Sequence, residues 1–334
     1  MKNTFFKIAT ALFVTGTVWL SSCTSDDAVN AVPVADKLAP DSASGGSVLT
    51  LTGSGLGEMR TIVFDNGNVP AGLNPAFNTD NAIVFRVPDT AFGGTQKIIF
   101  TNKYGKSVAV PFKVIALPIV TELSNTDFTK GTQVTVKGNN LNDVTKVLLA
   151  GSTAEAKVIS KTKKQMVIEM PASSSTRSKL TITNSSGTIT TQQELVSVDN
   201  NYGFFKDNFA DGLDNWSWGG DFTASTKNVW TGTRSLEAAY NGSWGGLSLH
   251  SSAGISTAGV NYLTFWAKGA DIDRQVSIKV NWATDKVVTI PANVWTYFKI
   301  PATGFLTMPV INDFVFQIHD DGKTIYFDNI LLVK

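Results

Sequence analysis

The tryptophans of this chain are concentrated in one part of its sequence. Seven of the eight lie between residues 216 and 295, and the eighth, Trp19, lies in an apolar segment near the N-terminus. An indole ring combines a large flat apolar surface with a polar N–H at its edge. We expect some of the seven rings to fill a core and the rest to form a surface that stacks on flat groups such as sugar rings.

Three tryptophans are the candidates for such a stacking surface. Trp216, Trp218 and Trp244 lie in stretches rich in glycine and serine, where no strand pattern buries them. Aromatic side chains beside glycine also pack inward as structural plugs, and this alternative stays open. Of the other four tryptophans, three lie in strand-like runs and are expected in the core: Trp266, Trp282 and Trp295.

Polar side chains alternate with apolar ones in two of the strand-like runs, residues 276–282 and 314–319. Because successive side chains of a strand point to opposite faces, one face of each run is expected in the core. The core set is Val276, Ile278, Val280, Trp282, Phe314, Phe316 and Ile318. The opposite faces carry the candidate hydrogen-bond partners for ligand hydroxyl groups, which are Lys279, Asn281, Gln317 and His319.

Other chemistry has weaker support in the sequence. His319 is followed by Asp320 and Asp321, which favours either a metal or acid–base site or, with Gly322, a simple turn. His250 is expected to be structural. Glycoside hydrolysis uses a pair of placed carboxyl groups, yet residues 199–334 contain a single glutamate, Glu237, within a strand-like run. No spacing typical of a Ser/His/Asp triad or a zinc site is visible.

Composition places the chain among secreted all-β proteins. Its 334 residues allow two or three domains, and charged residues make up only 16%. The formal net charge of +1 provides no electrostatic footprint for nucleic acid.

The N-terminus carries a targeting pattern. Lys2 and Lys7 precede an apolar run at residues 8–20, which has the length of a signal-peptide core. The run ends in Leu-Ser-Ser before Cys23, the only cysteine, and Thr-Ser-Asp-Asp follows. This pattern resembles the lipoprotein signal and export motif of Bacteroidetes surface lipoproteins. The alternative is an ordinary signal peptide with an incidental cysteine.

The resemblance implies a definite processing and location. Residues 1–22 would be removed as a signal peptide, Cys23 would be acylated, and residues 23–32 would form a tether. The implied location is the outer membrane, lipid-anchored and exposed at the cell surface.

An internal repeat follows. Residues 46–56 recur as residues 131–141 at an offset of 85, and later blocks recur in the same order. Each block is short, rich in β-branched residues and bounded by glycine, proline or asparagine, as in β-sandwiches. Two domains are therefore predicted, at 33–115 and 116–198. The aromatic side chains expected in their cores include Phe64, Phe85, Phe100 and Phe112.

The repeat resembles the IPT/TIG immunoglobulin-like domain. A glycine with leucine three residues later, Gly53 with Leu56 and Gly138 with Leu141, matches that family's turn. A Thr-Asn-x-x-Gly hairpin closes each unit, at 101–105 and 183–187. The resemblance implies spacer domains.

The segment 199–334 holds about nine strand-like runs and no helical periodicity, which predicts a jelly-roll β-sandwich. Its opening around Asp207 and Trp216, its run 263–269 and its closing Tyr-Phe-Asp-Asn-Ile resemble carbohydrate-binding modules. The whole arrangement resembles the surface glycan-binding lipoproteins of Bacteroidetes polysaccharide-utilisation systems.

That resemblance implies a non-catalytic protein that binds polysaccharide beside an outer-membrane importer and companion lipoproteins. Flat platforms favour a β-glucan or hemicellulose. Two alternatives stay open, a surface adhesin or assembly protein that binds another protein, and a small glycosidase or lyase. No cofactor is required. Many such modules hold a structural calcium ion near the chain ends, and the matching residues are Asp207 and Asp328, with Asp211 as a third carboxylate.

Overall fold

The computed structural model describes residues 32–334, which form β-strands and loops apart from one short helical turn, η1 (Pro75–Phe77). This confirms the all-β prediction. The expected signal peptide, Cys23 and nearly all of the tether lie outside the described residues. No helix within 32–334 is long and apolar enough to cross a membrane. The chain divides into two compact units, one ending at Val114 and the other containing residues 115–334.

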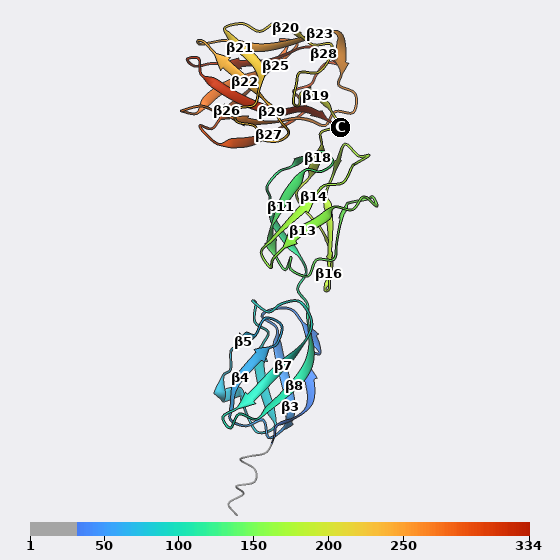
Figure 1. Cartoon of the computed structure of the whole chain (residues 1–334), viewed down its shortest axis with the longest axis vertical. Helices are drawn as coiled ribbons and strands as arrows, with labels where there is room; N and C mark the ends of the chain where they lie inside the picture. Colours follow the sequence, from blue (N-terminus) through green and yellow to red (C-terminus); the bar gives the residue numbers. More distant parts are fainter. Residues whose placement is uncertain (1–31) are drawn as a thin grey trace, which may run out of the picture. The chain divides into compact units, whose positions relative to one another are not determined.

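The first unit is an immunoglobulin-like sandwich (Figure 1). One sheet has the order β1 (Val34–Ala39), β3 (Val48–Ser54), β6 (Ala82–Arg86). The other has the order β2 (Ser42–Ala43), β8 (Ser107–Val114), β7 (Gly94–Asn102), β4 (Met59–Phe64), β5 (Val69–Ala71). Phe64, Phe85, Phe100 and Phe112 are all buried between the sheets, as predicted.

The second immunoglobulin-like domain repeats this plan at the start of the second unit. One sheet has the order β13 (Lys157–Lys161), β14 (Gln165–Glu169), β11 (Gln133–Asn139), β9 (Ile119–Leu123). Opposite it lie β12 (Lys146–Leu149), β16 (Leu180–Asn184) and β17 (Gly187–Thr190). A third small sheet has the order β10 (Asp127–Phe128), β18 (Leu195–Ser197), β15 (Arg177–Ser178).

The repeated glycine is explained by a close approach of two strands. A Cβ atom at Gly53 would lie 2.0 Å from the carbonyl oxygen of Val34, and one at Gly138 would lie 1.7 Å from that of Ile119. No side chain fits at either position, so the first strand of each domain can cross its neighbour only at glycine. Leu56 and Leu141 then turn into the two cores, where both are fully buried.

The C-terminal module, residues 199–334, is a sandwich of two antiparallel sheets (Figure 1). The first, which we call the outer sheet, has the order β20 (Asp214–Asn215), β23 (Gly246–Ser256), β28 (Val310–Ile318), β25 (Arg274–Val280), β26 (Thr284–Ile290). The second, the inner sheet, has the order β21 (Gly220–Ser225), β22 (Ser235–Tyr240), β29 (Thr324–Val333), β24 (Tyr262–Lys268), β27 (Trp295–Pro301), and β19 (Tyr202–Phe205) pairs with β29.

The module has eleven strands where about nine were expected. The two missed strands are β20, which has only two residues, and β21, whose sequence lacks a clear alternation. The apolar face of the outer sheet lies in the core as predicted, since Val276, Ile278, Phe314 and Phe316 are fully buried.

The second immunoglobulin-like domain and the module share a hydrophobic cluster. Val196 and Val198 of the domain pack with Tyr262, Leu331 and Val333 of the inner sheet. The outer face of the inner sheet is therefore covered by the preceding domain around β24 and β29, whereas Thr223 of β21 on the same sheet stays exposed. The outer face of the outer sheet is open.

Candidate functional site

Four tryptophans are exposed on the open face of the outer sheet. The exposed fractions are 56% for Trp216, 36% for Trp218, 56% for Trp244 and 55% for Trp282. We call this surface the tryptophan face. It brings together the three tryptophans selected from the sequence and adds a fourth.

Backbone pairing fixes the first two rings. The Trp216 N–H donates to the carbonyl of Ser248 at 2.9 Å, and Trp218 exchanges backbone hydrogen bonds with Gly246 at 3.0 and 2.9 Å. The Trp218 ring lies directly on Gly246, because a Cβ atom there would come within 2.3 Å of it. The Trp218 indole N–H donates to the carbonyl of Trp244 at 2.8 Å, which leaves the ring surface of Trp218 as its accessible part.

The other two rings are placed by left-handed turns. Trp244 has φ 63° and lies between β22 and β23, and Trp282 has φ 56° and lies between β25 and β26. A bulky residue with a left-handed backbone conformation is unusual and costs about 1–3 kcal/mol. Such strained residues cluster at functional sites.

The expectation that Trp282 lies in the core is wrong. Strand alternation ends at Val280, since Asn281 and Trp282 are both left-handed, with φ 51° and 56°. The chain therefore reverses at the point where the alternation would have pointed Trp282 inward. Its ring lies beside that of Trp218, with centroids 5.8 Å apart.

Each histidine of the chain supports one exposed tryptophan. The rings of Trp216 and His250 are stacked at 3.6 Å with an interplanar angle of 6°. Those of Trp244 and His319 are 5.0 Å apart at 30°. His250 was expected to be merely structural, and its position beneath Trp216 depends on the pairing of β23 with β20, which the sequence does not display.

Both imidazole rings are themselves held by the outer sheet. His250 Nδ1 is 2.8 Å from Asp313 Oδ1 on the adjacent strand β28, and His319 Nε2 is 2.7 Å from the hydroxyl of Ser277 on β25. These bonds fix the ring planes and, through them, the angle of the two tryptophans.

The predicted polar residues take different positions. Lys279 lies on the tryptophan face, 5.7 Å above the Trp282 ring and 3.7 Å from Asp285. The Gln317 amide donates to the carbonyl of Trp244 at 3.1 Å.

Asn281 is brought to the edge of this face, and its side chain serves the fold. Its amide nitrogen donates to the carbonyl of Val310 at 2.8 Å, and its oxygen accepts from the N–H groups of Asn312 and Asp313 at 2.7 and 3.0 Å.

The acidic residues near His319 form hydrogen bonds in the turn that follows β28. Asp320 Oδ2 accepts from the N–H of Gln275 at 3.5 Å, and Asp321 accepts from the Ser243 hydroxyl at 3.3 Å. Glu237 lies on the inner sheet, where it pairs with Lys227 at 3.2 Å. Within residues 32–334 no group of three or more His, Cys, Asp or Glu side chains is arranged to hold a metal ion.

The other three tryptophans of the module lie together on the opposite side. Trp230 contacts the second immunoglobulin-like domain, and Trp295, which was expected in the core, is half-buried at the start of β27. Trp266 is 8% exposed and stacks on Trp230 at 4.1 Å, and Trp295 is 6.1 Å from Trp230. The Trp230 indole N–H donates to Asn125 of the preceding domain at 3.2 Å.

A charged cluster adds to this junction. Glu194 of the domain accepts hydrogen bonds from Tyr262 and, at 3.0 Å, from Lys299 of the module. Although burial raises the pKa of Glu194, these hydrogen bonds and the charges of Lys299 and Arg177 bring it below its ordinary value. The carboxylate is thus held ionised where the two domains meet.

Two aspartates at the junction are buried without full hydrogen bonding. Burial raises the pKa of Asp127 to about 8 and that of Asp328 to about 7. Both residues are 0% exposed, and Asp127 Oδ2 and Asp328 Oδ1 form no hydrogen bond of good geometry within residues 32–334. The side chains of Asn329 and Trp266 lie near Asp127 and partly oppose the rise of its pKa.

The expected calcium residues hold one loop. Asp207 Oδ1 accepts from the N–H groups of Thr233 and Arg234 at 2.7 and 2.9 Å. Asp328 Oδ2 accepts from those of Trp230 and Thr231 at 3.0 and 3.2 Å. One carboxylate oxygen remains on each residue, whereas calcium takes about six or more oxygens. The pair therefore supplies only a small part of a calcium shell.

Fold and surface together define a multidomain all-β protein with an open aromatic face. Residues 118–198 match the IPT/TIG domain family, which identifies the second immunoglobulin-like domain. A search of curated proteins found no match.

Solved structures resemble most of the chain. The surface glycan-binding protein PbSGBP-B of Prevotella bryantii is 16% identical, with 91% of this chain and 99% of that chain covered and a TM-score of 0.56. SGBP-B from a complex xyloglucan utilization locus in Bacteroides uniformis is 19% identical, with 90% and 99% covered and a TM-score of 0.47. SGBP-B of the Bacteroides ovatus mixed-linkage glucan utilization locus is 14% identical, with 85% and 70% covered and a TM-score of 0.33. The resemblance to surface glycan-binding proteins is confirmed at the level of the fold.

Proposed function

We propose that this chain binds polysaccharide without catalysis, and that the tryptophan face is the binding surface. The observation that carries the proposal is the set of four exposed rings on one sheet face, two of them supported by histidine rings. A rigid ring presented to solvent stacks on the apolar face of a sugar with little loss of conformational freedom.

The open shape of the face favours a polymer over a small molecule. Each stacked ring is expected to contribute about 1 kcal/mol or more, by analogy with aromatic pairs. Several such contacts, with hydrogen bonds from Lys279 and Gln317, give an affinity of about a micromolar to a millimolar. Trp216, Trp218, Trp244, Trp282 and His319 complete the proposed contact set.

A β-glucan or hemicellulose is the favoured ligand, because flat rings suit extended β-linked chains. Binding of the full chain to a panel of insoluble polysaccharides tests this directly. Retention on one or more β-linked glycans supports the proposal, and retention on none contradicts it. A reducing-end assay on the same glycans separates binding from hydrolysis, and no release of reducing ends is expected.

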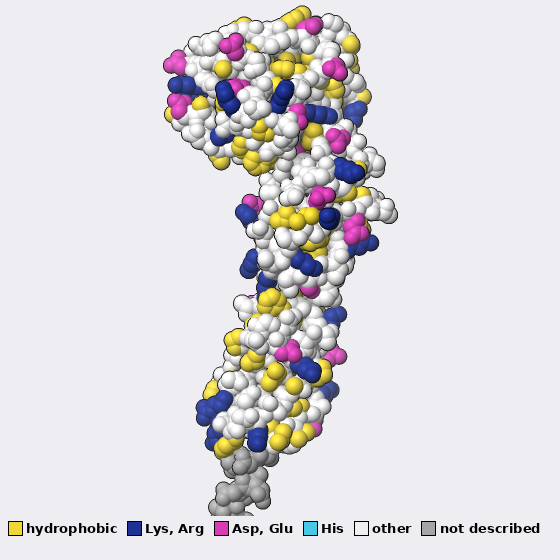
Figure 2. Space-filling view, viewed as in Figure 1, with side chains coloured by type: hydrophobic (Ala, Val, Ile, Leu, Met, Phe, Trp, Pro, Cys, Tyr) yellow, Lys and Arg dark blue, Asp and Glu magenta, His cyan; other side chains and the backbone are white. Residues whose placement is uncertain are grey.

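A surface adhesin or assembly protein is the second candidate, since aromatic patches are also enriched in protein interfaces. Lys279 and Asp285 bring charges of both signs to the tryptophan face beside Trp282. Figure 2 shows both signs of charge interspersed over the side of the molecule in view. Competition by soluble glycan against any protein partner would distinguish the two functions.

Anchoring at the outer surface is proposed from Cys23 and the residues around it, with an importer and companion lipoproteins as partners. Changing Cys23 to Ala should release the protein from membranes. Membrane association of the variant, or resistance of the native protein to external protease on intact cells, would contradict the proposal.

The proposed binding needs no cofactor. A structural calcium at Asp207 and Asp328 remains a proposal, and its role would be to brace the loop 230–234. Melting of the chain with calcium chloride and with a chelator tests it, because a bound ion should raise the melting temperature and the chelator should lower it.

A further inference from the structure

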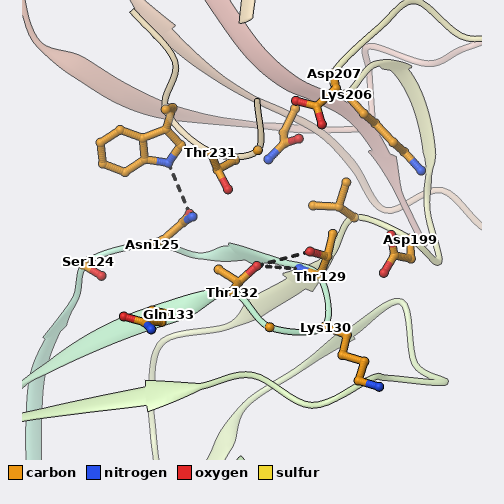
Figure 3. Close-up of a pocket in the computed structure, with 15 residues that line it drawn as sticks. Ser124, Asn125, Thr129, Lys130, Thr132, Gln133, Asp199, Lys206, Asp207 and Thr231 are labelled. Atoms are coloured by element: carbon orange, nitrogen blue, oxygen red, sulfur yellow. Dashed lines mark hydrogen bonds between the residues drawn. The ribbon is translucent and has the colours of Figure 1, made fainter. Parts of the chain in front are cut away.

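A polar cavity of about 730 Å³ lies where the second immunoglobulin-like domain meets the module (Figure 3). Both belong to the same compact unit. The volume falls within the range of about 300–1,000 Å³ that is usual for ligand pockets. None of its lining residues belongs to the outer sheet, so the cavity is separate from the tryptophan face.

The two walls come from different domains. Asn125, Thr129 and Thr132 of the immunoglobulin-like domain line one side, and Trp230 and Thr231 of the module line the other (Figure 3). The hydrogen bond from the Trp230 indole to Asn125 closes one end at 3.2 Å. The stack of Trp230 on Trp266, at 4.1 Å, fixes the orientation of this aromatic wall.

Some polar groups that line the cavity are not fully used in hydrogen bonds within the protein. The backbone N–H of Thr231 is bonded to Asp328, whereas its hydroxyl borders the cavity. Asn329 is 3% exposed and lines the cavity. Its side chain interacts with the buried Asp127, yet its amide nitrogen forms no hydrogen bond of good geometry within residues 32–334. A buried donor that is incompletely satisfied is rare in folded proteins and is a group that a ligand or water can complete.

The charged side chains that line the cavity have no net charge. Lys130 and Lys206 supply two cations, and Asp199 and Asp207 supply two anions. Burial lowers the pKa of Lys206, and the nearby charge of Asp199 opposes that shift. A lining without net charge disfavours a phosphate and favours a neutral ligand.

We propose that this cavity binds a short segment of neutral oligosaccharide, such as a chain end or side branch. Hydroxyl and amide groups beside one aromatic ring can bind the hydroxyl groups and the apolar face of a neutral saccharide. The choice of ligand class rests on the proposed function of the tryptophan face. The second immunoglobulin-like domain then contributes binding residues and is more than a spacer.

The test uses the full chain with ¹⁵N-labelled tryptophan, because the Trp230 indole N–H lies at the cavity. The double variant Trp216→Ala/Trp244→Ala removes the supported rings of the other site. It is titrated separately with a xylogluco-oligosaccharide and a mixed-linkage glucan heptasaccharide. The indole resonance of Trp230, assigned by Trp230→Phe, is expected to shift in a saturable way with at least one of them.

Matched variants locate the effect. Thr231→Val keeps the shape and the backbone hydrogen bond but removes the hydroxyl, and should weaken this binding about fivefold, the value of one net hydrogen bond. Thr223→Val, on the exposed side of β21, is the control and should leave it unchanged.

Two results would overturn the proposal. They are an unmoved Trp230 resonance with both oligosaccharides, and a shift that Thr231→Val leaves unaltered. The unmodified chain separates the two claims. If the Trp216 and Trp244 resonances respond and that of Trp230 does not, only the cavity proposal fails. If none responds, the proposed function fails.

Discussion

The tryptophans of the module fall into two groups on opposite sheets. Trp216, Trp244 and Trp282 are more than half exposed, whereas Trp266 on the inner sheet is 8% exposed. Trp266 is an outward-facing strand residue that is buried because Trp230 stacks on it and Asp127 of the preceding domain lies beside it. The comparison shows that a tryptophan is exposed or buried according to the residues that pack over it. Those residues can lie far away in the chain, so the local sequence does not reveal them.

The supports of the two groups also differ. Exposed Trp216 rests on His250, which is hydrogen-bonded to Asp313, so its outer ring face stays free. Buried Trp230 stacks on Trp266 and uses its N–H for a bond to Asn125. The first arrangement presents a surface, and the second joins two domains.

The largest expected effect is a loss of stability when a buried tryptophan is removed. Trp266→Ala should lower the free energy of unfolding by about 3–5 kcal/mol, because a large buried side chain leaves a cavity. Chemical denaturation of the full chain measures this. The affinity of the tryptophan face for glycan should stay unchanged in the folded fraction. A variant as stable as the native chain would remove the distinction between the groups.

A pH dependence of stability should follow from the buried aspartates beside Trp266. The pKa of Asp127 is about 8 in the folded chain, against 3.8 ordinarily, so between these values the folded state binds a proton that the unfolded state has lost. The stabilisation that this proton gives the folded state is fully present below pH 4 and is lost as the pH rises towards 8. One proton corresponds to about 1.4 kcal/mol per pH unit, or about 3 kcal/mol between pH 5 and pH 7.

Denaturation at several pH values checks this slope. Asp127→Asn should flatten it, and Asp328, with a pKa of about 7, should account for part of the remainder. The contribution of Asp127 is the difference in stability between the native chain and Asp127→Asn. If this difference rises between pH 5 and pH 7, Asp127 is ionised at the junction.

The module should depend on the domain before it. Residues 199–334 alone lose the packing of Val196 and Val198 and the ionic contacts of Glu194. We expect them to unfold more easily than residues 115–334, by about 2 kcal/mol or more from the lost apolar burial. Calorimetric melting of the two fragments checks this, and equal melting temperatures would mean that the junction adds nothing.

The smallest effect concerns the support of an exposed ring. His250→Ala should weaken glycan binding by about 1 kcal/mol, because Trp216 loses its stacking partner. His250→Phe keeps an aromatic ring beneath Trp216 and should restore most of the affinity. Equal losses in both variants, measured by calorimetric titration, would show that the hydrogen bond to Asp313 matters more than the stack.

Local patterns were sufficient to predict much of this molecule. The 85-residue repeat identified two sandwiches, because each strand and its bounding glycine recur in order. Glycine-rich surroundings identified Trp216, Trp218 and Trp244 as the exposed rings. Alternation identified the buried and open faces of β25 and β28.

The failures have physical causes. Trp282 was assigned to the core because alternation was extended past Val280 into a left-handed turn. The partners of Asn125, Asp127 and Glu194 lie about 70 to 200 residues further along the chain, so the junction has no local signal. The role of His250 likewise depends on strand register.

The central claim is that the exposed tryptophans bind and the buried ones join the domains. The most direct test measures calorimetric glycan binding and melting temperature together for Trp216→Ala/Trp244→Ala and for Trp266→Ala. We predict that the first variant loses the binding of the tryptophan face, so that only the binding proposed for the cavity remains, and melts like the native chain. The second variant melts lower, and the tryptophan face of its folded fraction keeps its affinity. A first variant that melts much lower while its folded fraction keeps full affinity would show that Trp216 and Trp244 are structural plugs, and would contradict the account.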